Sequence, residues 1–307
     1  MKELNIQSPP SGDLGGFLKK HYTKKTVIAY SREIEIFINN NPTNKTYTYT
    51  DIINYLGNLR IRYSNAKTIN RILSSIKAYY SYLCFIKERK DNPTKSIKLR
   101  DKQNRDIQLQ DLFSTEELEK LQTAKPERFI KLDYRNKVLI SLLIYQALKP
   151  NEIEALQVED INLGEATIYI KPSAKSNSRT LGLKANQILL FKNYLENIRP
   201  KLLGLASLPF GEVGGASLFF MIGQRKTPMT AEDITKHIKR NYNIYKPRNV
   251  NAQTIRQSVI TNLLKQNNDL RIVQAFAGHK YPSTTEKYKQ TNVTQLKLAL
   301  ELHHPFK

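Results

Sequence analysis

Residues 275–290 read AFAGHKYPSTTEKYKQ, and the fold and function of the 307-residue chain depend on how this stretch is interpreted. It places His279 nine residues before Tyr288, with Gly278 ahead of the histidine and a Ser-Thr-Thr cluster between the two. The chain holds 17 tyrosines, so a tyrosine alone carries little weight. Tyr288 is therefore either a nucleophile with a histidine partner or one more aromatic residue in a helix.

Basic residues dominate the composition. The chain has 49 Lys and Arg against 27 Asp and Glu, a formal net charge of +22 at pH 7 and a pI near 9.8. Such a surface favours a polyanionic partner, because binding releases counterions. Basic residues exceed acidic ones in both halves of the chain, so we expect the two halves to contact the partner from two sides.

The sequence argues against a membrane and a metal. No run approaches the roughly 20 apolar residues that cross a bilayer, and the N-terminus lacks the apolar stretch of a signal peptide. We therefore expect no membrane partner and a cytoplasmic location. Cys84 is the single cysteine, and five scattered histidines give no zinc-binding spacing, so we expect no metal.

Helical periodicity organises the N-terminal third of the chain. Apolar spacing predicts a helix over residues 23–39, a second that begins at Thr50, and a longer one over 65–87. Pro93 restricts the residue before it to extended geometry, so a first domain is predicted over residues 1–93. Residues 94–112 are charged and mostly non-periodic, which predicts an extended basic linker.

A second domain is predicted over residues 113–307. Its first helix starts with a Ser114–Glu117 capping box, and Pro150 suits the first turn of a later helix. The apolar period then changes to two, and EATIYIK and SRTLGL predict an antiparallel hairpin around the loop PSAKSN. The fold class is thus mainly α, with a small antiparallel β-sheet. Further helices are predicted at 134–148, 185–198, 230–243, 251–266 and 269–277, and a terminal one from about Val293.

Three segments resemble the boxes of the tyrosine recombinase (phage integrase) family and follow the family's order. ALKPNEIEALQVEDINL, residues 147–163, is similar to G-L-R-x-S-E-L. QTIRQSVITNLL, residues 253–264, is similar to H-x-L-R-H-x-x-A-T-x-L. AGHKYPSTTEKYKQ, residues 277–290, is similar to L-G-H-x-x-x-x-T-T-x-x-Y, with the same His-to-Tyr distance. The hairpin falls between the first two boxes, where the family keeps a lysine.

The resemblance covers nearly the whole chain and has a Xer-like two-domain organisation. It implies a SAM-like core-binding domain before a catalytic domain that ends in a C-terminal exchange helix. It also implies a site-specific DNA recombinase, or integrase, of a mobile element or a resolution system. Such an enzyme cleaves and rejoins DNA through a 3′-phosphotyrosyl intermediate, without metal or ATP, because the covalent link keeps the bond energy.

The resemblance implies a role for most of the candidate residues. Tyr288 matches the nucleophile, and Arg256 matches the arginine that holds two phosphate oxygens with its planar fork. His279 matches the histidine that donates a hydrogen bond to the phosphate. Lys175 matches the hairpin lysine that protonates the leaving oxygen, and Glu152 matches an acidic residue that orients its neighbours.

Two points of the assignment stay open. The length of the hairpin loop varies in the family, so Lys171 remains an alternative to Lys175. The chain also departs from the pattern at two positions, with Lys149 in place of an arginine and Gln253 in place of a histidine. A lysine lacks the bidentate fork, and a glutamine cannot exchange a proton near neutral pH. The alternative function is therefore a catalytically impaired, non-enzymatic DNA-binding protein of the same fold.

The resemblance also implies the partners. They are double-stranded DNA, further copies of the chain in a homodimer or tetramer on that DNA, and an accessory DNA-bending factor. The protein would then be associated with the nucleoid. Integration, excision, inversion and resolution are all compatible with these motifs.

Overall fold

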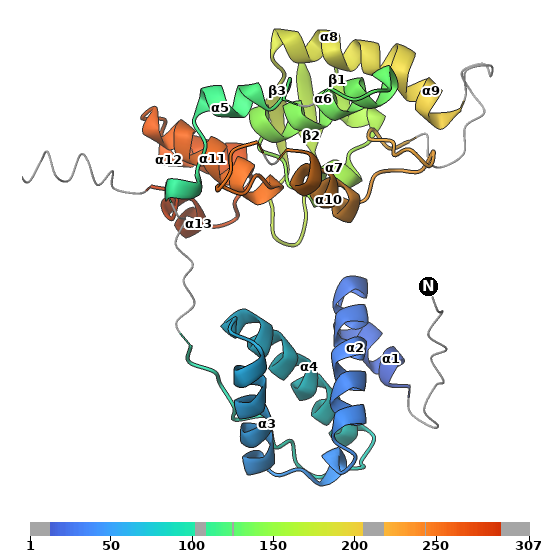
Figure 1. Ribbon diagram of the computed structural model, residues 1–307, viewed down its shortest axis with the longest axis vertical. Coiled ribbons are helices and arrows are strands. Elements are labelled where there is room, and N and C mark those ends of the chain that lie inside the picture. The colour runs from blue at the N-terminus through green and yellow to red at the C-terminus, as the bar shows by residue number, and fades with distance from the viewer. Residues whose placement is uncertain (1–12, 102–108, 125, 205–217, 243, 290–307) are drawn as a thin grey trace, which may run out of the picture. The chain divides into compact units, whose positions relative to one another are not determined.

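A computed structural model of the chain describes residues 13–101, 109–124, 126–204, 218–242 and 244–289 (Figure 1). The chain divides into two compact units, residues 1–105 and 106–307. The described parts are mainly helical and contain a three-stranded antiparallel sheet, which confirms the predicted fold class. The predicted terminal helix from Val293 lies outside the described residues.

The first unit is a small helical bundle in which α2 and α3 pack on α4 and α1 packs on both α2 and α4. Its core is formed by side chains such as Leu18, Phe37 and Tyr80, none of which is exposed. The predicted helices over 23–39 and 65–87 are confirmed as α2 and α4. The elements are α1 (Leu14–His21), α2 (Lys24–Asn40), η1 (Asn44–Thr46), α3 (Tyr49–Arg62) and α4 (Ala66–Phe85).

The predicted capping residue of α3, Thr50, is wrong by two positions, and the helix begins at Tyr49. Thr48 is the cap, because its hydroxyl accepts from the backbone N–H of Asp51 and the Asp51 carboxylate accepts from the N–H of Thr48. Both threonines can cap a helix, and the reciprocal bond to an acidic residue three positions later decides between them.

The segment after α4 packs on the first unit. Thr94 and Ile97 are buried, and Lys77 Nζ donates to the carbonyl of Ile97 at 2.6 Å. The start of the predicted linker, residues 94–112, thus contributes to the core of this unit. Residues 102–108 lie outside the described part, and the predicted domain boundaries stay predictions.

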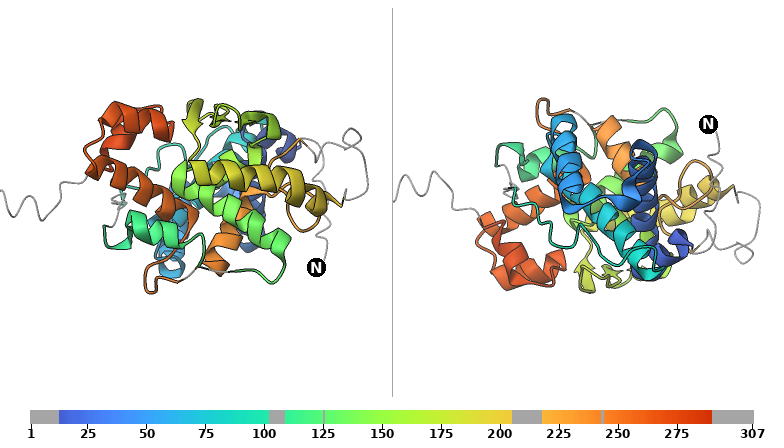
Figure 2. Two further views of the ribbon diagram at one scale, coloured as in Figure 1. Left: turned by 90° about the horizontal axis from the view of Figure 1, so that it is seen from above. Right: turned by 90° about the horizontal axis from the view of Figure 1, so that it is seen from below.

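The second unit surrounds the buried helix α6, which α8 and α9 follow along one side and α11 contacts elsewhere (Figure 2). The strands pair in the order β1-β2-β3, with Ile168 opposite Leu181 and Ile170 opposite Arg179. The predicted hairpin is confirmed as β2 and β3, and the sequence did not predict β1. The elements are η2 (Leu109–Asp111), α5 (Thr115–Lys120), α6 (Ile130–Tyr145), α7 (Pro150–Ala155), η3 (Val158–Asp160), β1 (Ile161–Asn162), β2 (Thr167–Ile170), β3 (Arg179–Gly182), α8 (Ala185–Asn193), the π-helical turn η4 (Tyr194–Ile198), α9 (Arg199–Leu203), α10 (Ala231–Asn241), α11 (Ala252–Lys265), α12 (Leu270–Ala277) and α13 (Pro282–Glu286).

Helix α11, which carries two candidate site residues, is tied to the start of this unit. Ser258 Oγ accepts from the backbone N–H of Phe113 at 2.9 Å, and Asn262 Nδ2 donates to the Phe113 carbonyl at 3.0 Å. Ser258 and Phe113 are both buried. These bonds fix α11 against the segment that precedes α5, whose predicted Ser114–Glu117 capping box is confirmed.

Ser258→Ala should lower the free energy of unfolding by about 1–3 kcal/mol, because it leaves the buried N–H of Phe113 without an acceptor. Urea denaturation measures this loss. Ser178→Ala removes the hydroxyl of an exposed loop serine and serves as the control. Equal stability of the two variants would contradict the described role of the Ser258 bond.

Candidate functional site

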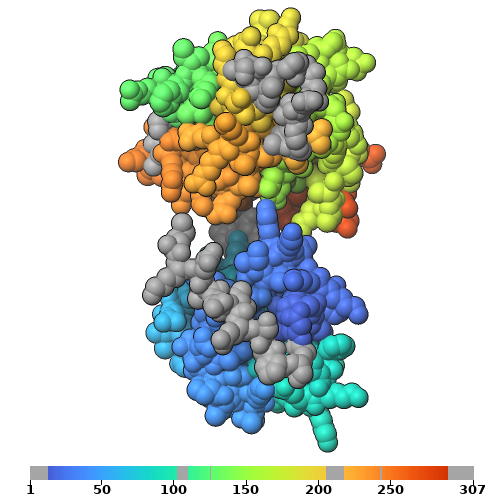
Figure 3. Space-filling model, turned by 90° about the vertical axis from the view of Figure 1, so that its right-hand side faces the viewer, coloured from blue at the N-terminus to red at the C-terminus, as the bar shows by residue number. Residues whose placement is uncertain are grey.

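A cavity of about 930 Å³ in the second unit is lined by all six residues that the resemblance assigns to catalysis. They come from the start of α7, the hairpin loop, α11, and the residues that directly follow α12 and α13. Figure 3 shows α10 and the hairpin segment on one face of this unit, and Lys239 of α10 also lines the cavity. The six residues are Lys149, Lys175, Gln253, Arg256, His279 and Tyr288.

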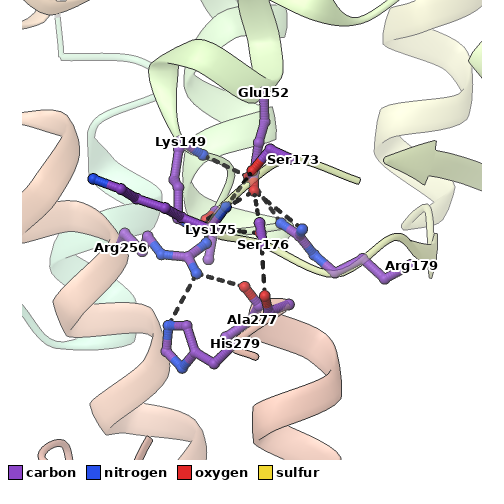
Figure 4. A network of polar contacts seen from close by, with 11 residues as sticks. Lys149, Glu152, Ser173, Lys175, Ser176, Arg179, Arg256, Ala277 and His279 are labelled. Carbon is purple, nitrogen blue, oxygen red and sulfur yellow. Dashed lines mark hydrogen bonds and ion pairs between the residues drawn. The ribbon is translucent and has the colours of Figure 1, made fainter. Parts of the chain in front are cut away.

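Glu152 and Arg179 form a buried ion pair beside the cavity (Figure 4). Arg179 Nη1 lies 3.1 Å from Glu152 Oε1, and Nη2 lies 2.8 Å from Oε2. Burial raises the pKa of Glu152, but hydrogen bonds and charge from Arg179, with the N–H of Lys149 and the charge of Arg256, bring it to about 2. Glu152 is therefore ionised, and its carboxylate accepts both hydrogen bonds from the guanidinium of Arg179.

Gly278 allows the third box to approach this ion pair. Its φ of +65° lies in the left-handed region, and a Cβ atom there would lie 2.5 Å from Arg179 Nη1. The backbone of Asn177 donates to the Gly278 carbonyl at 3.0 Å. The hairpin loop and the end of α12 are thereby held together.

Arg256 is buried, and its guanidinium connects the first box to the third. It donates to the carbonyls of Ala147 and Ala277, and Nη2 lies 3.2 Å from His279 Nε2. A guanidinium has five N–H donors, so among the described residues Nε–H and one N–H of Nη1 have no partner and remain for a ligand. Arg256 can therefore offer two donors to an anion in the cavity while it keeps its three internal partners.

His279 is buried and uncharged near neutral pH. Burial lowers its pKa to about 4, and the positive charges of Arg256, Lys149 and Arg179 add to the effect. Nε2 faces Arg256, which can only donate, so Nε2 is the accepting nitrogen. The proton consequently lies on Nδ1, 3.0 Å from Thr285 Oγ1. In this arrangement the imidazole carries no proton on the nitrogen that faces Arg256.

Tyr288 lies against His279. The two rings stack with centroids 5.7 Å apart and planes 21° from parallel. Burial raises the pKa of the Tyr288 phenol above its ordinary value, and the charge of Arg256 partly offsets this. The phenol is thus protonated at neutral pH in the DNA-free chain.

The structure distinguishes between the two hairpin lysines. Lys175 is exposed and lines the cavity. Lys171 does not line it, and its ammonium contacts Gln157 and lies 3.2 Å from Glu159 and 3.4 Å from Asp160. This geometry favours Lys175 as the lysine that reaches a bound ligand.

Lys149 and Gln253, the two departures from the family pattern, both line the cavity. Lys149 Nζ lies 3.3 Å from Ser176 Oγ and 3.8 Å from Glu152 Oε1. Burial and the charge of Arg256 lower the pKa of Lys149. Gln253 is exposed in the first turn of α11, where Asn251 caps its backbone N–H.

The sequence did not identify Ser176 and Arg179 as site residues. Arg179 occupies an inward position of β3, because the strand alternates and Leu181 is also buried. A charged residue on the inward face of a strand needs a buried partner of opposite charge. That alternation was a signal for Arg179, whereas nothing in the sequence distinguishes Ser176 from the other serines of the loop.

Within the described part of the chain, none of the helices is both long and apolar enough to span a bilayer. Among the same residues, no three His, Cys, Asp or Glu side chains are grouped so as to hold a metal ion. The cavity is instead lined by cationic and hydrogen-bonding side chains that suit an anion.

Sequence profiles of one family match both units of the chain. The profile of the phage integrase family matches residues 112–295, and that of the phage integrase N-terminal SAM-like domain matches residues 17–86. The chain belongs to the phage integrase family. This membership confirms the predicted function, site-specific DNA recombination by a tyrosine recombinase, and gives the impaired alternative no support over it.

Known tyrosine recombinases resemble this phage integrase over nearly its whole length. The tyrosine recombinase XerD of Staphylococcus saprophyticus is 27% identical over 299 residues, which is 94% of this chain and 95% of the relative. XerD of Oceanobacillus iheyensis is also 27% identical, over 296 residues, with the same coverage of both chains.

Solved structures show that the fold of this phage integrase is shared. The Tn1549 transposon integrase in complex with a circular intermediate DNA has a TM-score of 0.65 at 16% identity, and the match covers 94% of this chain and 99% of that one. The XerH recombinase bound to its difH substrate has a TM-score of 0.63 at 19% identity, with coverage of 92% and 94%. A lambda integrase dimer bound to a core site has a TM-score of 0.63 at 15% identity, with coverage of 91% and 93%.

His279 should titrate with a pKa near 4 in the DNA-free protein, well below the ordinary value of about 6.5. Between these two values the unfolded chain binds a proton that the folded chain does not, so this histidine makes stability fall as pH falls through that range. NMR titration of the imidazole, assigned by comparison with His279→Gln, measures it. A midpoint near 6.5 would show that the ring is neither buried nor surrounded by cations.

Proposed function

We propose that this phage integrase breaks and rejoins double-stranded DNA with Tyr288 as the nucleophile. The observation that supports this most strongly is that one cavity is lined by Tyr288 together with Lys149, Lys175, Arg256 and His279. Cations and hydrogen-bond donors that line one cavity suit a phosphodiester, whose single negative charge is shared by two non-bridging oxygens. The tyrosine beside them suits covalent catalysis.

In the proposed reaction the Tyr288 oxygen attacks the phosphorus atom and the bond from phosphorus to the 5′-oxygen breaks. The phenol loses its proton to solvent water as the new bond forms, and the leaving 5′-oxygen takes a proton from the ammonium of Lys175. The product is a 3′-phosphotyrosyl link and a free 5′-hydroxyl. Attack by the 5′-hydroxyl of another strand reverses these steps and rejoins the DNA.

The cations of the cavity have two effects in this proposal. The two remaining donors of Arg256 and the ammonium of Lys149 stabilise the charge that develops on the non-bridging oxygens. They also favour the phenolate, because opposite charge nearby lowers the pKa of an acid. Gln253 can donate a hydrogen bond to the same phosphate, and His279 can do so once the arriving anion favours protonation of Nε2.

The partners belong to the proposal as well. The net charge of +22 supports DNA as the substrate. We propose that the chain acts as a dimer or tetramer on its site in the nucleoid, with the C-terminal segment exchanged between protomers and an accessory factor that bends the DNA. The lambda integrase structure, a dimer bound to a core site, and the XerH structure, bound to its difH substrate, support a dimer on its recombination site by analogy of fold alone.

A nicked suicide substrate tests the nucleophile. Wild-type protein mixed with nicked duplexes from the DNA that flanks its gene should form a protein–DNA adduct stable in SDS, and Tyr288→Phe should form none, because it lacks the attacking oxygen. Tyr281→Phe is the matched control, since Tyr281 lies in the same segment and is 69% exposed. An adduct that persists in Tyr288→Phe, or its absence from the wild type on every duplex, would contradict the proposal.

A substrate with a better leaving group tests the proton donor. Lys175→Ala should slow cleavage of the normal phosphodiester by about 10²–10⁴-fold, the usual contribution of a general acid. Sulfur in place of the bridging 5′-oxygen should remove most of that defect, because a thiolate leaves without a proton. Lys171→Ala should behave like the wild type on both substrates. The same sulfur-dependent rescue of Lys171→Ala would transfer the role to Lys171.

A further inference from the structure

The hydroxyl of Ser176 occupies the centre of the polar network beside the cavity (Figure 4). Ser176 lies in the hairpin loop and is 1% exposed. Its Oγ atom is 3.3 Å from Lys149 Nζ, 3.0 Å from Glu152 Oε1 and 3.1 Å from the carbonyl oxygen of Gly278. One buried hydroxyl therefore contacts both functional residues of the first box and the backbone of the third.

The chemistry of these partners fixes how the hydroxyl is used. A serine hydroxyl has one proton to donate and two lone pairs to accept with. The carboxylate of Glu152 and the carbonyl of Gly278 only accept, so the proton is directed to that side. The ammonium of Lys149 only donates, so a lone pair of Ser176 Oγ accepts from it.

Among the contacts that the structure describes, no other polar atom lies as close to the Lys149 ammonium as Ser176 Oγ. The other partner of this ammonium is Glu152, at 3.8 Å. The oxygens of that carboxylate already accept from Arg179 at 3.1 and 2.8 Å and from the backbone N–H of Lys149 at 2.9 Å. Ser176 is thus the nearest polar partner described for the ammonium, and the nearby Arg256 repels it.

A lysine at this position needs such an anchor more than an arginine would. An ammonium is a point charge on a flexible four-carbon stem, and fixing that stem costs conformational entropy. A planar guanidinium is already organised to hold two oxygens at once. The family pattern has an arginine here. This chain therefore keeps the positive charge but lacks the planar group that holds two oxygens in a fixed geometry.

We propose that Ser176 is a positioning residue for Lys149. Its buried hydroxyl holds the ammonium at the wall of the cavity and so supplies, from the hairpin loop, the orientation that a guanidinium has by itself. The consequence for catalysis rests on the proposed function, whereas the contact between hydroxyl and ammonium can be tested without any reaction.

The first test measures the ammonium directly in the full-length, DNA-free protein. NMR titration of ¹³Cε-labelled lysines follows Lys149, identified by the signal that Lys149→Arg removes. Ser176→Ala should lower the pKa of Lys149 further, because an acceptor that favours the charged form is lost while Arg256 and Arg179 remain nearby. Ser178→Ala, in the same loop and exposed, should leave it unchanged. An unchanged pKa in Ser176→Ala would overturn the proposal.

The second test measures coupling between the two residues. Ser176→Ala should slow single-turnover cleavage of a suicide substrate about tenfold without weakening DNA binding, since interacting pairs commonly couple by this much. In the Lys149→Arg background the same change should cost less than about threefold, because a guanidinium does not need the hydroxyl. Equal losses in both backgrounds would mean that Ser176 acts elsewhere and would overturn the proposal.

The two tests also separate this inference from the proposed function. Absence of cleavage by the wild-type protein would refute the recombinase chemistry, while the titration would still decide whether Ser176 holds Lys149. Ser176→Cys offers a similar shape with a weak acceptor, so it gives the same two readouts should Ser176→Ala fail to fold.

Discussion

The buried pair of Glu152 and Arg179 is the interaction on which the candidate site depends. Glu152 is the one carboxylate among the residues described around three cationic side chains, those of Lys149, Arg179 and Arg256. Burying several positive charges together is costly unless an anion compensates them. The pair also joins α7 to β3, and β3 lies against the end of α12 through Gly278. A single carboxylate thus compensates part of this positive charge and aligns the first box, the hairpin and the third box.

This arrangement explains how a basic site can exist before its ligand arrives. Within the described part of the chain, Arg256 uses three of its donors internally and keeps two for an anion. His279 is neutral, so it adds no further positive charge. Lys149 is held by a hydroxyl rather than by a strong ion pair, since Glu152 already pairs with Arg179. The site is therefore compact and organised while its cations remain available to a phosphate.

The spacing of short motifs predicted much of this. Three ordered boxes and a change of period from helix to strand gave the fold class and six residues that do line one cavity. The capping residue of a helix was harder to predict. Thr48 and Thr50 are equally good candidates for α3 until the bond to Asp51 is known. The roles of Ser176 and Arg179 depend on contacts across more than 20 residues of sequence, which periodicity does not reveal. The sequence motif favours Lys175 over Lys171 as the proton donor. The ion pairs of Lys171 with Glu159 and Asp160 supply a physical reason for that choice.

The central claim is that the cavity receives the phosphate which Tyr288 attacks. A structure of the Tyr288→Phe variant bound to its DNA site measures this most directly. Our account predicts one phosphate in the cavity, with its non-bridging oxygens within hydrogen-bonding distance of Arg256 and Lys149 and its 5′-oxygen facing Lys175. It also predicts the ring at position 288 on the opposite side of the phosphorus atom from the 5′-oxygen. A DNA backbone that passes the cavity without placing a phosphate against Arg256 would contradict the account.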